Sequence, residues 1–247
     1  MERSKIFIGI TDCGRKFPLY ENWIRKFDNR AEVIRLSYHL NNFSDAEQCD
    51  GFVLSGGHDV HPRYYNKPEF YELLDPREVD ARRDEFEFKV IELSQRKKRP
   101  LLGICRGLQL TNVYFGGTLI PDIFTHLRVE GHDKSEESDT MHAVMVEDET
   151  MLHKIVEARN GEINSAHHQS ADSIGEDLRV NALSVDGIVE GLERKTSADH
   201  ASLLLVQWHP ERLPNQESNF SKNIRSYFMR EVTRGEGKIK IDMPGPA

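Results

Sequence analysis

Short apolar runs alternate with stretches of helical periodicity along the first half of the chain. Such alternation is typical of a parallel β-sheet that helices cover on both faces. We expect strands at residues 5–11, 32–36, 51–55 and 100–104. We expect helices in the amphipathic stretch around Trp23 and over residues 79–97, where apolar side chains recur with helical spacing. The first half therefore predicts an α/β fold with a mostly parallel central sheet.

The second half carries closely spaced apolar runs that predict further strands, some of them antiparallel. These runs cover residues 143–146, 178–183, 188–192 and 203–207. A closing amphipathic helix with Phe220 and Phe228 follows. We expect a single domain over residues 1–234 and a mobile tail, rich in glycine and proline, over residues 235–247. The polar residues 127–140 predict a loop, either a lid or a solvated excursion.

Charge and hydropathy exclude several classes of protein. The net charge of −8 comes without the clustered lysine and arginine that bind phosphates, so we expect no nucleic-acid partner. No apolar run reaches the roughly 18 residues of a membrane helix, and residues 1–5 lack a signal-peptide core. We therefore expect a cytoplasmic protein with no membrane partner. Cys13, Cys49 and Cys105 lack CxxC spacing, which argues against a disulfide scaffold and a zinc site.

Cys105 stands between an apolar strand and Gly107, which allows a sharp turn into the next helix. This arrangement is typical of a nucleophile elbow, here with cysteine in place of serine. The helix N-terminus favours a thiolate, and the N–H that follows points to where an oxyanion would form. A buried core cysteine is the alternative, and Cys105 taken alone does not decide between them.

His209 and Glu211 follow the last apolar strand, where open α/β sheets place their sites. Pro210 stiffens the turn, and the Glu211 carboxylate can accept a hydrogen bond from the second imidazole nitrogen, as the third member of a catalytic triad does. A lone histidine is more often a surface or core residue. A histidine at a strand end, in a chain that also has a cysteine elbow, favours catalysis.

Gly56 and Gly57 follow a third strand. Paired glycines let the backbone approach a ligand closely and direct an N–H at it, although a simple tight turn fits them equally well. Three such features, each at the end of a separate strand, favour an active site.

Together these segments resemble the class I glutamine amidotransferase-like superfamily and, within it, the γ-glutamyl hydrolase branch, peptidase C26. The segments that carry the resemblance are residues 55–62, 80–87, 103–109, 112–122, 164–169 and 206–211. Two departures are Trp208, where phenylalanine is common, and Pro121, where a polar residue is usual. The resemblance implies a flavodoxin-like three-layer sandwich and no cofactor.

The resemblance also implies roles for individual residues. Cys105 would attack the γ-carbonyl of a γ-glutamyl amide, with His209 moving the proton and Glu211 orienting the ring. The oxyanion would be held by the backbone N–H groups of Gly57 and Arg106, with Gly56 as a further donor. The glutamyl group would be bound by Gln109, His168 and Gln169, with packing between strands as the alternative for the histidine.

Charged and histidine residues outside the triad leave two questions. Asp80, Arg83, Asp84 and Glu87 form a network on the helix that faces the site, either a structural ion-pair cluster or a substrate contact. The histidines predict no metal site. His58 and His61 show no ligand constellation, and His167 and His168 cannot both ligate one ion from a regular strand.

We expect a cysteine-dependent hydrolase that cleaves a small γ-glutamyl amide to glutamate and an amine through a glutamyl thioester. One alternative is a glutaminase subunit that supplies ammonia to a separate synthetase. A further alternative is a non-catalytic regulatory relative. The sequence does not identify the leaving amine, and a homodimer is the default assembly.

Overall fold

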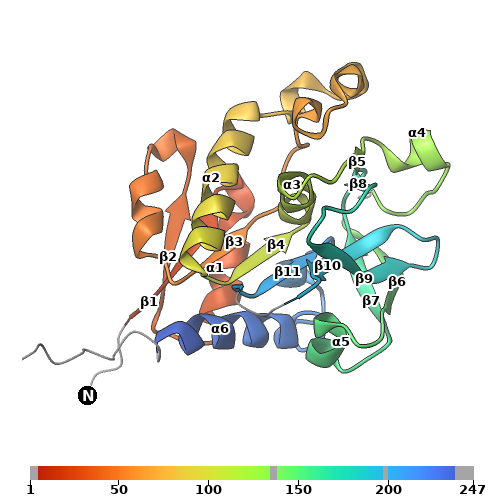
Figure 1. Cartoon of the computed structure of the whole chain (residues 1–247). Helices are drawn as coiled ribbons and strands as arrows, with labels where there is room; N and C mark the ends of the chain where they lie inside the picture. Colours follow the sequence, from red (N-terminus) through yellow and green to blue (C-terminus); the bar gives the residue numbers. More distant parts are fainter. Residues whose placement is uncertain (1–4, 134–137, 197–199, 237–247) are drawn as a thin grey trace, which may run out of the picture.

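A nine-stranded sheet lies between two layers of helices in the computed structural model, which describes residues 5–133, 138–196 and 200–236 (Figure 1). Its parallel half has, in spatial order, β2 (Ala31–Leu36), β1 (Ile6–Thr11), β3 (Gly51–Leu54), β4 (Leu101–Ile104) and β11 (Leu203–Val206). Its antiparallel half continues with β10 (Val189–Arg194), β9 (Leu178–Ser184), β6 (Thr140–Val146) and β7 (Asn160–Ser165). This arrangement confirms the predicted fold class.

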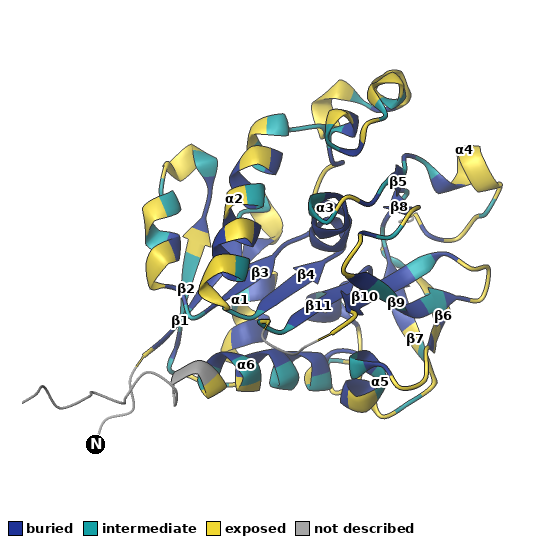
Figure 2. Ribbon diagram, in the orientation of Figure 1, coloured by how far each residue is buried: buried dark blue, intermediate teal, exposed yellow. Residues whose placement is uncertain are grey.

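The two faces of the sheet bury separate cores. One core is shared with α1 (Phe17–Arg25), α5 (Met151–Val156) and α6 (Lys222–Glu236). The opposite core is shared with α2 (Ala81–Lys97) and α3 (Arg106–Tyr114). The central strands are buried throughout, as Figure 2 shows for β3, β4 and β11, because helices cover both of their faces.

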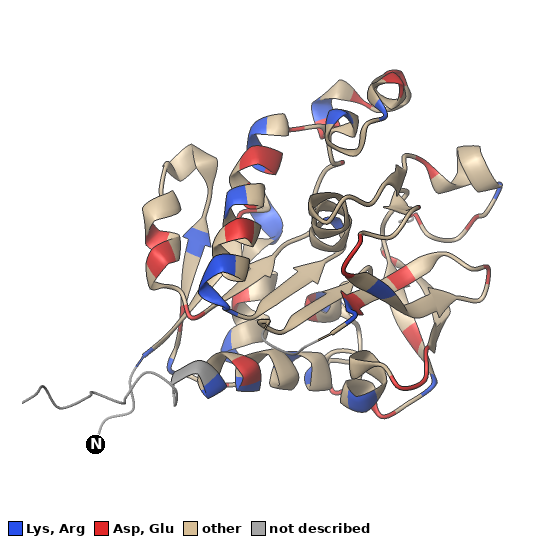
Figure 3. Ribbon diagram, in the orientation of Figure 1, with Lys and Arg blue, Asp and Glu red and all other residues tan. Residues whose placement is uncertain are grey.

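A smaller sheet of β5 (Leu119–Ile120) and β8 (Ser170–Ala171) lies near the short, exposed helix α4 (Ile123–Leu127) beside the antiparallel half (Figure 1). Three 3-10 helices, Pro62–Tyr65, Pro68–Leu73 and Pro76–Glu78, form the excursion between β3 and α2. Acidic and basic residues are mixed along α2 (Figure 3). No described helix is long and apolar enough to cross a membrane.

The structure adds elements in the second half that the sequence does not predict. Strand β7 is an edge strand with mostly polar residues, so it gives no apolar run. Helix α5 has only six residues, which are too few to show helical periodicity. Strand β6 begins at Thr140, inside the predicted loop 127–140, of which residues 134–137 lie outside the described residues. Helix α6 extends to Glu236, two residues into the predicted tail, and residues 237–247 lie outside the described residues.

Candidate active site

Three neighbouring strands end in the loops that carry the predicted site. Gly56 and Gly57 follow β3, Cys105 follows β4, and His209 comes three residues after β11. The strands are adjacent and parallel in the order β3-β4-β11, so their carboxyl ends meet at one edge of the sheet. The fold therefore gathers these segments, although they are far apart in the sequence.

Cys105 occupies the predicted elbow, with a φ of 53° and a ψ of −108°. A positive φ is uncommon for a residue with a side chain and stores backbone strain, which is a frequent feature of active sites. Its N–H donates to the Val206 carbonyl at 2.8 Å, and α3 begins at the next residue. Gly107 permits this turn, because a Cβ there would lie 2.4 Å from the Leu54 carbonyl oxygen.

His209 is buried between Cys105 and Glu211. Its Nδ1 lies 2.8 Å from Glu211 Oε1, and the ring lines the same pocket as Cys105. Burial lowers the pKa of His209, but the charges of Glu211 and Cys105, with hydrogen bonds to both, outweigh burial and raise that pKa to about 9. The ring is therefore able to hold a proton at neutral pH.

The two glycines after β3 differ in what their N–H groups do. The Gly56 N–H donates to the Tyr20 hydroxyl at 2.9 Å, and that hydroxyl also lies 3.4 Å from His209 Nδ1. The Gly56 N–H is thus already engaged in this structure, and its role as a further oxyanion donor stays a prediction. Among the described residues the Gly57 N–H has no hydrogen-bond acceptor, and Arg106, as the first residue of α3, has none within its helix.

A buried ion-pair network joins α2 to the loop after β3 and to the start of α3. The Arg106 guanidinium pairs with Asp84 and, at 2.5 Å, with Glu87. Glu87 also accepts from Arg83 at 2.7 Å, and Arg83 donates to the Gly56 carbonyl at 3.0 Å. Position 57 favours glycine because its φ of 152° is one that residues with a side chain rarely adopt, and a Cβ there would also lie 2.1 Å from Arg83 Nη1. These contacts give the network a structural role.

Cys105 and His209 line a pocket of about 360 Å³. Gln109, also at the pocket, donates to the Gln169 carbonyl at 3.0 Å and to Gln207 Oε1 at 3.3 Å. The side-chain amide of Gln169 is buried at the pocket wall and has no hydrogen-bond partner among the described residues. Charged residues of both signs complete the lining: Arg15, Lys16, Arg212, Asp59, Glu78 and Asp133.

His168 lines the pocket, but both of its ring nitrogens are already engaged. Nε2 lies 2.9 Å from Asp59 Oδ1, and Nδ1 lies 3.3 Å from Asp122 Oδ2. Both ring nitrogens are thus occupied by carboxylates, and the role of His168 as a ligand for the substrate stays a prediction. The hydrogen bond to Asp59, helped by Asp122, raises the pKa of His168 to about 9 although burial opposes it.

This raised pKa predicts a pH-dependent contribution of His168 to stability. The folded pKa lies above the ordinary value near 6.5, so the contribution is complete below about pH 6.5 and is lost as the pH rises through 9. We expect the free energy of unfolding of His168→Gln to fall below that of the parent at pH 6, with the gap closing by pH 9.5. Urea titrations at both pH values measure this gap, and a gap that is constant with pH contradicts the assignment.

The structure places further residues at the site that the sequence does not single out. Tyr20 reaches it from α1, where its position in an apolar helix face indicates only core packing. Asp59 and Asp122 hold His168 from two separate loops. Behind the pocket wall, His132, His142 and His167 surround Glu190, although the sequence predicts no metal constellation among the histidines.

Several known proteins resemble this chain in sequence or in fold. The chain is 31% identical over 217 residues to protein NtpR of Enterococcus hirae, covering 86% of this chain and 87% of that protein. It is 32% identical over 172 residues to the γ-glutamyl-γ-aminobutyrate hydrolase PuuD of Escherichia coli, covering 66% of this chain and 65% of that protein. The glutaminase domain of Trypanosoma brucei CTPS, solved with acivicin bound, matches the fold with a TM-score of 0.62 at 12% identity, covering 93% of this chain and 94% of that one.

A family model agrees with these relatives and with the resemblance inferred from the motifs. The model of peptidase C26 matches residues 35–211, which contain β3, β4, β11 and the three loops that follow them. The chain therefore belongs to the peptidase C26 family of class I glutamine amidotransferase-like proteins.

Proposed function

We propose that the protein hydrolyses a γ-glutamyl amide to glutamate and an amine, with Cys105 as the nucleophile. Membership of the peptidase C26 family supports an amidohydrolase activity in general. The observation that carries the finer proposal is the relay of Cys105, His209 and Glu211, which opens into a pocket beside the Gly57 and Arg106 N–H groups.

The proposed reaction has two halves. The Cys105 thiol gives its proton to His209 as the sulfur attacks the γ-carbonyl carbon, and the oxyanion accepts hydrogen bonds from the Gly57 and Arg106 N–H groups. The carbon–nitrogen bond breaks, and the amine leaves with that proton from His209, which Glu211 orients. His209 then takes a proton from water, whose oxygen attacks the thioester. The carbon–sulfur bond breaks, His209 returns the proton to the Cys105 sulfur, and glutamate leaves.

The pocket suits the free end of a glutamyl group, which carries an ammonium and a carboxylate. Side chains of both charges line it, and the Gln169 amide offers both a donor and an acceptor without a protein partner among the described residues. Gln109 supports this wall through its hydrogen bond to the Gln169 carbonyl. The name of the PuuD relative, which acts on a γ-glutamyl compound, supports the same substrate class.

A glutaminase that passes ammonia to a synthetase is the second candidate. The likeness to a glutaminase domain favours it, because the same relay releases ammonia when the substrate is glutamine. A non-catalytic relative is the third candidate, and the joint presence of Cys105, His209 and Glu211 in hydrogen-bonding positions argues against it.

Two anilides separate these candidates. We expect the purified protein alone to release the chromogenic aniline from γ-glutamyl anilide and not from the α-glutamyl isomer. We also expect a glutamine-like electrophile to modify Cys105, as peptide mass spectrometry would record. Turnover that appears only after a synthetase is added would favour the ammonia donor. Failure of both the hydrolysis and the labelling would favour the non-catalytic relative.

A further inference from the structure

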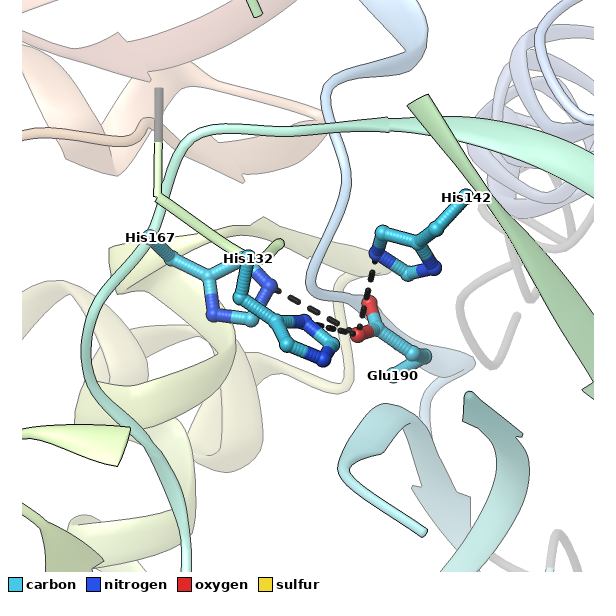
Figure 4. A group of neighbouring side chains, drawn as sticks. All are labelled: His132, His142, His167 and Glu190. Carbon is cyan, nitrogen blue, oxygen red and sulfur yellow. Dashed lines mark ion pairs between the residues drawn. The ribbon is translucent and has the colours of Figure 1, made fainter. Parts of the chain in front are cut away.

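Four side chains from the antiparallel half, none of them a member of the catalytic relay, point towards one another (Figure 4). His142 lies on β6 and Glu190 on β10, whereas His132 precedes β6 and His167 follows β7. One donor atom from each lies within 4.8 Å of the others, and all but the partly exposed His142 are buried. We call these four residues the histidine cluster.

The inward atoms of the histidine cluster lack conventional hydrogen bonds. His132 Nδ1, His142 Nε2 and His167 Nε2 lie 3.3, 3.5 and 3.5 Å from Glu190 Oε1. None of these nitrogens, and neither oxygen of the carboxylate, has a hydrogen-bond partner among the described residues. Because buried polar groups are normally paired, five such atoms facing one another require something between them.

The outward nitrogens indicate which tautomer each ring adopts. His132 Nε2 faces the Asp186 carboxylate at 3.2 Å. His142 Nδ1 faces the Ala143 carbonyl at 3.1 Å, and His167 Nδ1 faces the Gln169 carbonyl at 2.9 Å. Carbonyl and carboxylate oxygens only accept, so each outward nitrogen carries the proton. A neutral ring then directs its lone pair at Glu190, as metal-ligating histidines do.

We propose that the histidine cluster binds one divalent transition-metal ion, with zinc as the ion it fits best. Three imidazole nitrogens and a carboxylate form a common ligand set for zinc. Zinc–nitrogen bonds of about 2.0–2.1 Å imply about 3.3–3.4 Å between ligand atoms of a tetrahedron. The three distances to Glu190 already match this edge length.

The position of the cluster indicates a structural role for the ion. Four protein ligands close a tetrahedral zinc site and leave no place for a reacting water. The ion would fasten the segment before β6 and the segment after β7 to β10. That second segment continues from His167 into His168 and Gln169, which line the active-site pocket. The metal would therefore hold one wall of the pocket, and the relay of Cys105 and His209 would keep its own geometry.

Metal analysis tests the proposal without depending on the hydrolase reaction. We expect the protein, stripped with a chelator and equilibrated with zinc chloride, to retain about one zinc per chain and to unfold at a higher temperature. Cobalt(II) in the same unmutated protein should give the visible absorption of a tetrahedral site. This measurement stays informative if a variant fails to fold. Bound zinc well below one ion per chain, with no shift in the unfolding temperature, would overturn the proposal. Protons shared between the histidines and Glu190 would then link the cluster.

Variants locate the ion within the chain. Glu190→Gln and His142→Ala should lose bound zinc, and Asp186→Asn should weaken binding by about 10–100-fold, because Asp186 only orients His132. His153→Ala is the matched control, since His153 is a partly exposed histidine that pairs with Asp148 outside the cluster. Equal zinc retention by all four variants would refute the assignment to these residues.

Discussion

Cys105→Ala is expected to lower kcat for γ-glutamyl anilide by about 10⁴-fold or more, because the thioester has no other route to form. The thermal unfolding midpoint should stay near that of the parent, since alanine fits the same strained backbone at the start of α3. Initial rates under saturating substrate measure the effect, with circular dichroism to confirm the fold.

Two comparisons distinguish a nucleophile from a thiol that only packs. Cys13→Ala changes a half-buried thiol of the same pocket and should keep kcat within about tenfold. His209→Ala should lose about as much as Cys105→Ala, and the double variant should lose no more, because members of one relay act as a unit. Residual turnover in Cys105→Ala above a few per cent would remove Cys105 from the reaction.

Arg106→Met should lower the free energy of unfolding by about 3–5 kcal/mol, which is a large share of the stability of a domain. The guanidinium is 1% exposed and pairs with Asp84 and Glu87, both buried. Methionine preserves much of the volume but removes the ion-pair partner of the Asp84 carboxylate, which keeps only the hydrogen bond from the His61 N–H in an interior that solvates charge poorly. Glu87 keeps its second partner, Arg83. Urea denaturation at neutral pH measures the loss.

A second substitution separates two causes of the expected loss of stability: the unpaired buried charge and the lost side-chain packing. Adding Asp84→Asn to Arg106→Met should restore part of the stability, because the stranded carboxylate becomes a neutral amide. Arg77→Met provides the surface comparison, since Arg77 pairs with Asp75 in solvent, and its unfolding midpoint should not move measurably. A loss below about 1 kcal/mol for Arg106→Met would show that the buried pairs contribute little.

The central parallel strands β3, β4 and β11 could be predicted because they are buried on both faces and form unbroken apolar runs, as Leu101–Ile104 does. Strand β7 could not be predicted in this way. It lies at the edge of the sheet, and only its last three residues, 163–165, are buried. The parts of the sheet least covered by helices therefore leave the weakest signal in the sequence.

Cys105, His209 and Glu211 could be singled out as candidates because they lie at or shortly after the ends of apolar strands, which the strand order brings together. The contacts that the sequence could not predict come from distant segments. Tyr20 engages the Gly56 N–H from α1, and Asp59 and Asp122 hold His168 from two loops. The histidine cluster was equally hidden, because its members come from four places whose pairing depends on the antiparallel register.

The adjacency of β3, β4 and β11 has a consequence for how such a protein can diversify. Neighbouring strands lie about 4.8 Å apart in any sheet. The backbone hydrogen bonds between strands therefore set the spacing of the loops that carry Cys105, His209 and the two glycines. The rim of the pocket comes from other segments, among them the excursion that supplies Glu78 and the turn that supplies Arg15. Replacing the rim segments would therefore change which ligand the pocket recognises, while the residues at the strand ends keep their positions.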